Sequence, residues 1–273
     1  MSGVAGILLA DKPPGISSHD VVARARRALG ERRIGHAGTL DPFATGLLIL
    51  LVGGATRLQR FFMALPKTYE VTAVLGASSS TGDPEGEISR GERPAEPLTL
   101  PLGRIRQRPP AYSAVKVGGE RAYTRARRGE TVVLAEREVE VYGWDVLWRE
   151  GDRVGLRIAC SSGTYIRSLI SDLGDAYCLE LRRTAIGPFE VEGAWETQGH
   201  ATLIDVLSAC GRFVPSISLD PPAIDALRHG QAIEASSEAP LLLLIDAATG
   251  APEALAERRE HEAGATLRPI FRP

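Results

Sequence analysis

A loop rich in glycine and proline, residues 35–46, most constrains what this chain can fold into. It reads GHAGTLDPFATG and runs directly into the apolar block LLILLV at residues 47–52. Three glycines and a proline oppose a regular helix, so the pattern predicts a loop anchored by a buried strand. Such a loop can hold its one carboxylate, that of Asp41, rigidly enough for chemistry. The alternative is a tight turn in which Asp41 only accepts hydrogen bonds from backbone N–H groups.

The composition indicates a globular protein of the reducing cytoplasm. Apolar residues make up 44% and charged residues 24% of the chain, and no apolar run is long enough to span a membrane. Asp11 and Lys12 interrupt the first apolar run, so no signal segment is expected. The three cysteines are widely spaced and contain no Cys-x-x-Cys pair, so neither a disulfide framework nor a zinc site is expected.

Positive charge is concentrated in two segments, although the whole chain has a net charge of −2. Residues 1–68 carry +5 and residues 104–128 carry +7, which predicts a local surface for phosphate. The alternative is a solvated helix face whose arginines are paired elsewhere. Residues 213–273 carry −4 and several prolines, and this change of character predicts a separate small β-rich domain after a domain of residues 1–212.

Strand and helix patterns interleave without a regular strand–helix–strand repeat, which favours an α+β fold. Alternating or continuous apolar runs predict strands at residues 6–10, 47–52, 67–75, 138–142, 154–160, 241–245 and 267–271. Helical spacing predicts helices at 17–30, 56–65, 121–128 and 166–173, and a short one ending at 229. The polar stretch from residue 78 to about 101 is expected to be a surface connection.

Six segments, in order, resemble the motifs of the TruB family of tRNA pseudouridine synthases. They are DKPPGISS at 11–18, GHAGTLDPFATGLL at 35–48, PKTY at 66–69 with TGD at 81–83, QRPPAYSAVK at 107–116, SSGTYIRSL at 161–169 and LRRT at 181–184. The resemblance implies a mixed, mainly antiparallel sheet flanked by helices, a thumb-like RNA-binding insertion at about 104–130 and a reduced PUA-like domain at 213–273. The chain departs from the family pattern by shorter segments at 92–102 and 174–181.

The resemblance also implies the reaction and its residues. The family isomerises uridine 55 in the T loop of tRNA to pseudouridine after flipping the base out of the loop. Asp41 is then the nucleophile, Arg167 keeps it ionised, and Tyr69 stacks on the uracil while its hydroxyl handles the C5 proton. The implied RNA-binding residues are His36, which takes the place of the flipped base, Tyr165 and Leu181, which line the uridine site, and Lys12, Lys116, Arg125 and Arg128, which grip phosphates.

Each of these roles has a structural alternative. Tyr69 can be a core tyrosine, Arg167 an exposed arginine in the first turn of a helix, and His36 a histidine that only supports the glycine-rich loop. The isomerisation involves no redox change and no transferred group, so neither a cofactor nor a metal is expected.

Two other functions remain open: an RNA-binding or RNA-folding protein of the same shape, and a guide-RNA-dependent rRNA synthase of a related branch. The combination of Asp41, Tyr69 and Arg167 favours an enzyme over a passive RNA binder. The compact tail, without a long lysine-rich extension, favours a stand-alone monomer that needs tRNA but no protein partner.

Overall fold

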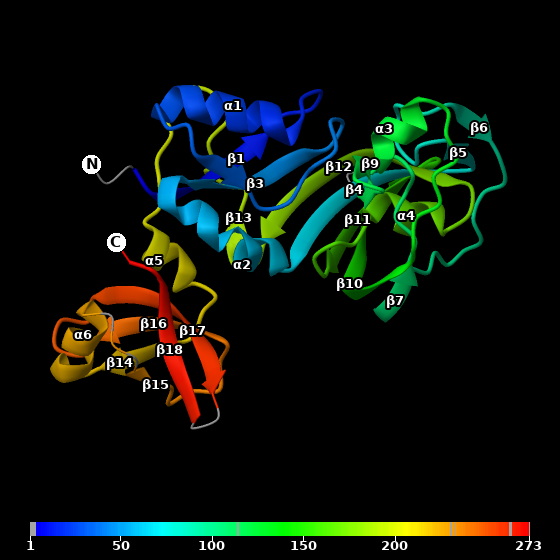
Figure 1. Ribbon diagram of the computed structural model, residues 1–273. Coiled ribbons are helices and arrows are strands. Elements are labelled where there is room, and N and C mark those ends of the chain that lie inside the picture. The colour runs from blue at the N-terminus through cyan, green and yellow to red at the C-terminus, as the bar shows by residue number, and fades with distance from the viewer. Residues whose placement is uncertain (1–3, 114, 230, 232, 262–263, 273) are drawn as a thin grey trace.

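The computed structural model describes residues 4–113, 115–229, 231, 233–261 and 264–272. This part of the chain contains a nine-stranded sheet and a five-stranded sheet, with the short helix α5 (Val206–Cys210) between them (Figure 1). Few helices accompany these sheets, which confirms the α+β class. Among the described residues, no helix is both long and apolar enough to cross a membrane.

The large sheet is mixed and mainly antiparallel, as the resemblance implies. Its strands lie in the order β1-β3-β12-β4-β11-β10-β7. Off this path, β2 pairs with β3 and β13 pairs with β12. Adjacent strands of this path are antiparallel, apart from the parallel pair β3 and β12. Their bounds are β1 (Gly6–Lys12), β2 (Ile34–His36), β3 (Thr45–Val52), β4 (Lys67–Leu75), β7 (Gly103–Gln107), β10 (Arg137–Glu150), β11 (Arg153–Cys160), β12 (Ala176–Ile186) and β13 (Phe189–Glu190).

Gly46 permits the close approach of β3 and β12. Its φ is +102°, and a Cβ at this position would lie 2.2 Å from the carbonyl oxygen of Arg183 on β12. No other residue type fits such a gap without moving a backbone. The glycine therefore brings the loop that precedes β3 directly beside β12.

Helix α1 (Ser18–Leu29) forms as its sequence predicts. Ser17 and Asp20 make a capping box, and Gly30 ends the helix with φ +63°. Its buried face, which includes Val22, packs on the large sheet at Leu48. The helix expected at 56–65 begins as a 3-10 turn (Gly53–Leu58) and continues as α2 (Gln59–Ala64).

The remaining helices of the first domain flank the far end of the large sheet. Helix α4 (Ile166–Ser171) buries Ile166, Leu169 and Ile170, as the spacing predicts. Helix α3 (Ala122–Arg127) follows the hairpin of β8 (Lys116–Val117) and β9 (Glu120–Arg121) in the expected thumb. The segment around residues 78–101 is not only a surface connection, because Asp83, Leu98 and Leu100 are buried. It contains the hairpin of β5 (Ala77–Ser79) and β6 (Ile88–Arg90), which are too short and polar to give an alternating pattern.

The C-terminal sheet has the order β14-β16-β17-β18-β15. Its elements are β14 (Ser216–Leu219), helix α6 (Pro221–Arg228), β15 (Ile233–Glu234), β16 (Leu241–Asp246), β17 (Pro252–His261) and β18 (Gly264–Phe271). Strand β17 was not predicted. Its sequence, PEALAERREH, is rich in helix-forming residues, and antiparallel pairing with β16 and β18 outweighs that preference.

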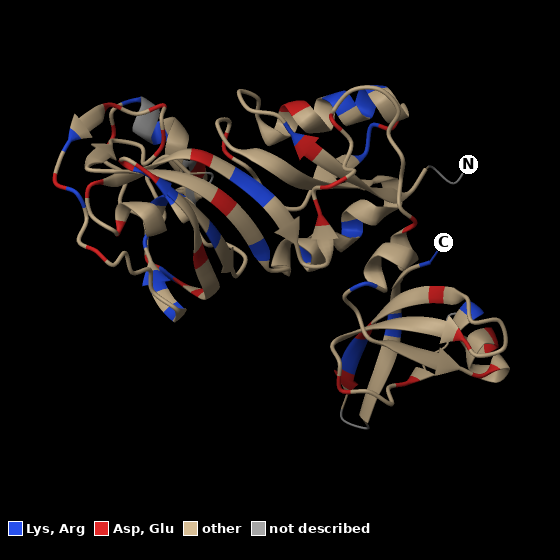
Figure 2. Cartoon of the chain, turned by 180° about the vertical axis from the view of Figure 1, so that it is seen from behind, with Lys and Arg blue, Asp and Glu red and all other residues tan. Residues whose placement is uncertain are grey.

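One hydrophobic cluster joins the two sheets. Phe62 and Phe189 of the larger part pack in the same cluster as Leu243, Leu255 and Phe271 of the C-terminal sheet. An ion pair between Arg60 and Glu257 lies across the same junction. Away from it, charged residues of both signs are scattered over several strands of the large sheet (Figure 2). The expected boundary at residues 212 and 213 therefore falls inside a continuous core.

Candidate active site

The loop between β2 and β3 is held at both of its ends. Arg183 on β12 donates from Nε to the carbonyl of Leu47 at 2.7 Å and from Nη2 to that of Gly38 at 3.1 Å. Ser18, the first residue of α1, accepts at its Oγ a hydrogen bond of 2.9 Å from the N–H of Leu40. Sheet and helix thus fix the backbone on either side of Asp41, as expected of a loop that presents a reactive group.

Lys12 supports this loop from inside and does not face solvent. Its Nζ donates to the carbonyls of Pro13, Ile16 and Pro42 at 2.9, 2.8 and 3.1 Å. The side chain is fully buried, and this burial lowers the pKa of Lys12 to about 8. The expectation that Lys12 grips a phosphate is therefore wrong for this structure, because all three ammonium protons are used on backbone carbonyls.

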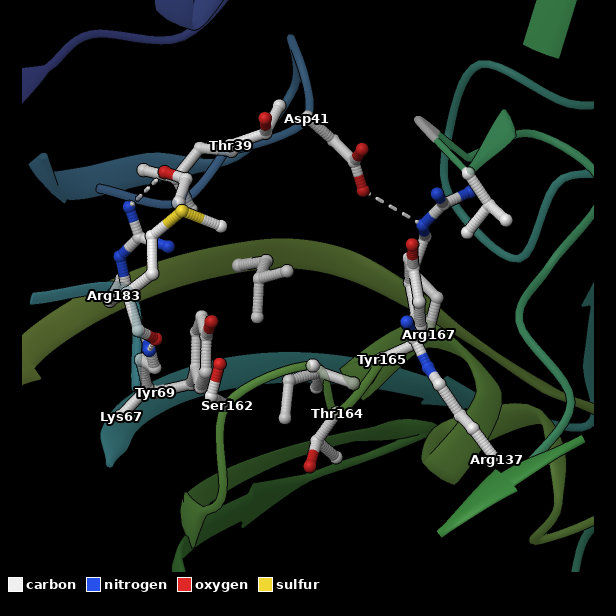
Figure 3. A pocket seen from close by; sticks show the side chains of 17 residues that line it. Thr39, Asp41, Lys67, Tyr69, Arg137, Ser162, Thr164, Tyr165, Arg167 and Arg183 are labelled. Carbon is white, nitrogen blue, oxygen red and sulfur yellow. Dashed lines mark hydrogen bonds and ion pairs between the residues drawn. The ribbon is translucent and has the colours of Figure 1, made fainter. Parts of the chain in front are cut away.

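A cavity of about 330 Å³ opens beside Asp41 (Figure 3). Asp41 and Arg167 lie on one side of it, and Lys67, Tyr69 and Arg183 lie on the other. Leu181 and Tyr165 complete much of the wall. The structure thus brings together all three expected catalytic residues and two of the expected uridine-site residues.

The Asp41 carboxylate is ion-paired with Arg167. Its Oδ2 lies 3.0 Å from Nε of Arg167, and about a third of the Asp41 side chain (32%) remains exposed to the cavity, while the Arg167 side chain is 3% exposed. Burial raises the pKa of the Asp41 carboxyl, and the guanidinium of Arg167 opposes that rise. A carboxylate that is aimed by a buried cation and still accessible can act as a nucleophile or a base.

A second carboxylate, that of Asp83, holds Arg167 from the opposite side. Nη1 of Arg167 lies 2.9 Å from Oδ2 of Asp83, and the remaining donors reach the carbonyls of Thr81 at 2.7 Å and Tyr112 at 2.6 Å. Asp83 also accepts from the hydroxyl of Thr81 at 2.5 Å. Asp83 lies in the TGD segment but is not among the predicted site residues. The signal that could have identified it is an acid in an otherwise small, polar turn.

Tyr69 lies in the cavity wall on β4 with its ring largely buried. Burial raises the pKa of the Tyr69 hydroxyl, and the nearby Arg183 guanidinium opposes this. Its neighbour Lys67 donates from Nζ to the carbonyls of Met63 and Leu65, and burial lowers the pKa of Lys67 to about 8. Tyr69 therefore presents a neutral phenol at neutral pH.

Tyr165 is fixed through its backbone and its ring. Gln107 on β7 accepts from the N–H of Tyr165 at 2.8 Å and donates to its carbonyl at 2.9 Å. The guanidinium carbon of Arg137 lies 4.6 Å from the centre of the Tyr165 ring. Leu181 on β12 is buried and lines the same cavity. The shortened segment before Leu181 does not displace it from the site.

His36 lies at the end of β2, with its ring 5.4 Å from that of His19 in an edge-to-face arrangement. A second cavity of about 250 Å³ adjoins Asp41 and Arg167 on their other side and is lined by His19, Tyr112 and other residues. His36 lines neither cavity. The structure therefore does not bring His36 into the wall of the cavity around Asp41.

The structure describes two of the three side chains of the thumb that are expected to bind phosphate, those of Arg125 and Arg128. Arg125 and Arg128 form ion pairs with Glu130 at 2.6 and 2.7 Å, and Arg128 also pairs with Glu120 at 2.7 Å. These pairs are on the surface and can exchange for phosphate at little cost. The side chain of Lys116 lies outside the described residues.

Comparison with known proteins identifies close relatives. Residues 26–166 match the family model described as TruB family pseudouridylate synthase (N terminal domain). A protein of Thermobifida fusca (strain YX) named tRNA pseudouridine synthase B is 44% identical, covering 93% of this chain and 94% of that protein. One of the same name from Leifsonia xyli subsp. xyli (strain CTCB07) is also 44% identical, over 83% of this chain and 82% of its own.

Solved structures share the fold. A chain in the crystal structure of a Cbf5-Nop10-Gar1 complex superposes with a TM-score of 0.66 and 25% sequence identity. The match covers 98% of this chain and 85% of the other, so it includes the C-terminal sheet as well as the large one.

Proposed function

This chain belongs to the TruB family of pseudouridylate synthases, and we propose that it isomerises uridine 55 in the T loop of tRNA to pseudouridine, with Asp41 as the nucleophile. The names of its relatives support tRNA as the substrate. The observation that carries the proposal is the 3.0 Å ion pair between Asp41 and Arg167 at the wall of a cavity large enough for a nucleoside.

The reaction requires one carboxylate that is ionised and aimed. Isomerisation breaks the C1′–N1 bond, turns the uracil and rejoins it through C5, so it neither needs an oxidant nor releases a product other than the modified RNA. Asp41 frees the base by nucleophilic catalysis. Arg167 supplies the positive charge that favours the ionised form of Asp41 despite its burial.

Asp83 is proposed to be a positioning residue that fixes the orientation of Arg167. With one carboxylate at Nε and the other at Nη1, the Arg167 guanidinium cannot rotate without losing both ion pairs. In our proposal Asp83 does not touch the uridine. It fixes Arg167, and Arg167 in turn fixes Asp41.

Tyr69 and Leu181 are proposed to hold the flipped uracil between them. Both are buried in the cavity wall, one aromatic and one aliphatic, which suits the two faces of a planar base. The hydroxyl of Tyr69 is proposed to handle the C5 proton. Because its pKa is raised, the hydroxyl stays protonated and acts as a relay, through which the C5 proton leaves to solvent while N1 of the turned uracil gains a proton.

RNA outside the cavity is proposed to contact the thumb and the C-terminal sheet, here assigned as a domain of residues 213–273 after the catalytic domain of residues 1–212. Arg125 and Arg128 stay exposed enough to exchange Glu120 and Glu130 for phosphates, and Lys116 is assigned to the same surface. Such contacts orient the RNA without reading its sequence. His36 is proposed to fill the gap left by the flipped base, which requires the RNA to reach the β2 end of the loop.

Pseudouridine mapping tests this function directly. The purified protein is incubated with unmodified tRNA and no other RNA, and pseudouridine is located by chemical derivatisation and primer extension. The proposal expects one new pseudouridine, at position 55, and loss of that residue from the tRNA of cells that lack the protein. Modification elsewhere, or only when a guide RNA is added, would contradict it.

A further inference from the structure

Arg137 is a cavity residue whose guanidinium has no anionic partner among the described residues. It begins β10 and lines the 330 Å³ cavity together with Lys67, Arg167 and Arg183. Arg167 and Arg183 direct their donors to Asp41, Asp83 and backbone carbonyls. Among the described residues, Arg137 makes no ion pair, and its buried Nε has no hydrogen-bond acceptor.

The position of Arg137 is nevertheless well defined. Its guanidinium stacks on Tyr165 at 4.6 Å and lies over Gly163, where a Cβ would come within 3.8 Å of the guanidinium carbon. Its backbone is paired with that of Gln107, the residue that holds the backbone of Tyr165. Figure 3 shows Arg137 reaching up to Tyr165 below Arg167. A stacked guanidinium keeps its edge donors free for a planar or anionic acceptor.

The charge balance of the cavity indicates which part of the substrate Arg137 meets. Four cations, Lys67, Arg137, Arg167 and Arg183, line this cavity with Asp41 as the carboxylate among its lining residues. Uracil is neutral and needs no such excess, whereas a flipped nucleotide brings its phosphodiester. An unpaired, partly buried guanidinium is costly until an anion reaches it.

We propose that Arg137 binds a phosphodiester oxygen next to the flipped uridine. This rests on the proposed function, since it assumes that a uridine of an RNA enters the cavity. In this arrangement Tyr165 serves as the platform that orients the guanidinium, and Arg137 places the ribose relative to Asp41. Arg137 is thus a substrate-binding residue beyond those expected from the sequence.

Neutralised linkages in the RNA test the proposal. RNA stem-loops are made with a methylphosphonate at the linkage 5′ or 3′ of the target uridine, and their affinities are measured by fluorescence anisotropy for the wild type, Arg137→Gln and Arg157→Gln. Arg157 is a matched control, since it lies on neighbouring β11, outside the thumb, with its side chain 52% exposed and ion-paired with Glu70 at 2.8 Å. Isomerisation leaves the linkages unchanged, so binding is interpretable whether or not the base is converted.

The wild type and Arg157→Gln should lose affinity about ten- to hundredfold for one of the two modified RNAs, as expected of a charge-assisted hydrogen bond. Arg137→Gln should bind that RNA and the unmodified RNA equally, and Arg137→Lys should restore part of the difference. If Arg137→Gln keeps the wild-type loss of affinity at that linkage, or if the wild type loses no affinity at either linkage, the phosphate assignment is wrong. Because the readout is binding, these results are distinct from a wild type that makes no pseudouridine, which would refute the proposed function itself.

Discussion

Arg167 and Asp83 are joined by an ion pair of 2.9 Å in which both side chains are buried. Arg167 therefore sits between two carboxylates, of which only Asp41 keeps substantial exposure to the cavity. The two carboxylates differ in their surroundings: Asp83 is buried against the guanidinium, and Asp41 remains accessible from the cavity.

Asp83→Asn should lower turnover by about ten- to hundredfold with little change in RNA affinity, because a partner that orients a reactive group contributes on that scale. Single-turnover rates at saturating tRNA check this. Rates within twofold of the wild type would show that Arg167 needs no second anchor. A variant that is equally slow but also unfolded is recognised by its near-UV circular dichroism.

Lys12→Met should impair the loop rather than RNA binding. The ammonium joins the carbonyls of Pro13, Ile16 and Pro42, next to Asp41. We expect slower turnover and an unchanged slope of log K against log salt concentration, since no phosphate contact is lost. A slope that is smaller by about one unit, the change expected for one lost phosphate contact, would show that Lys12 binds a phosphate.

The same residue predicts a pH dependence of stability. The pKa of Lys12 is about 8 in the folded protein, below its usual 10.5. Between these values the unfolded chain binds a proton that the folded chain does not, so the free energy of unfolding from this group rises with pH. As pH falls to 8 that contribution is lost. Lys12→Met should show a shallower rise between pH 8 and 10.5 in denaturant titrations; an identical rise would mean that Lys12 does not titrate in this window.

Tyr69→Phe separates stacking from proton transfer. The ring and its burial are kept, and the hydroxyl is removed. If the hydroxyl handles the C5 proton, the rate should fall about 10²–10⁴-fold with unchanged binding. A rate within about fivefold of the wild type would leave Tyr69 as a stacking platform only, given the size of acid–base contributions.

Removal of residues 213–273 should destabilise the remaining chain. Phe62 and Phe189 would lose Leu243, Leu255 and Phe271 from their shared cluster. Truncation after residue 212 should lower the melting temperature and increase binding of a hydrophobic dye. Arg60→Ala, which removes the ion pair to Glu257 at the junction and the stacking of the exposed Arg60 side chain on Phe61, is the control and should change little. An unchanged melting temperature after truncation would show two independent domains.

Local signals predicted the local structure well. The capping box of Ser17 and Asp20 and the alternation of 67–75 each specify their element through neighbouring residues, and both form as predicted. Strand β17 could not be predicted in this way, because its residues prefer a helix and its structure depends on β16 and β18.

The motifs predicted the candidate site residues that line the cavity beside Asp41. They did not predict which charged residues are buried. Asp41, Tyr69 and Arg167 lie together, as the resemblance implies. Lys12 ends β1 and Asp83 lies in a polar turn, and a sequence alone places such charged residues on the surface. Their burial follows from tertiary contacts with Pro42 and Arg167, far away in the chain.

Asp41→Asn tests the central claim most directly. The substitution keeps the size of the side chain but replaces one carboxylate oxygen by an NH2 donor and removes the charge of the nucleophile, and tritium release from tRNA labelled at C5 of uridine measures the remaining turnover. Asp225→Asn is the matched control, since this acid on α6 has a side chain that is 75% exposed. We predict that Asp41→Asn binds tRNA as the wild type does and releases no tritium, while Asp225→Asn is fully active. Tritium release by Asp41→Asn above about one per cent of the wild-type rate would contradict the role of Asp41, since loss of a nucleophile costs several powers of ten.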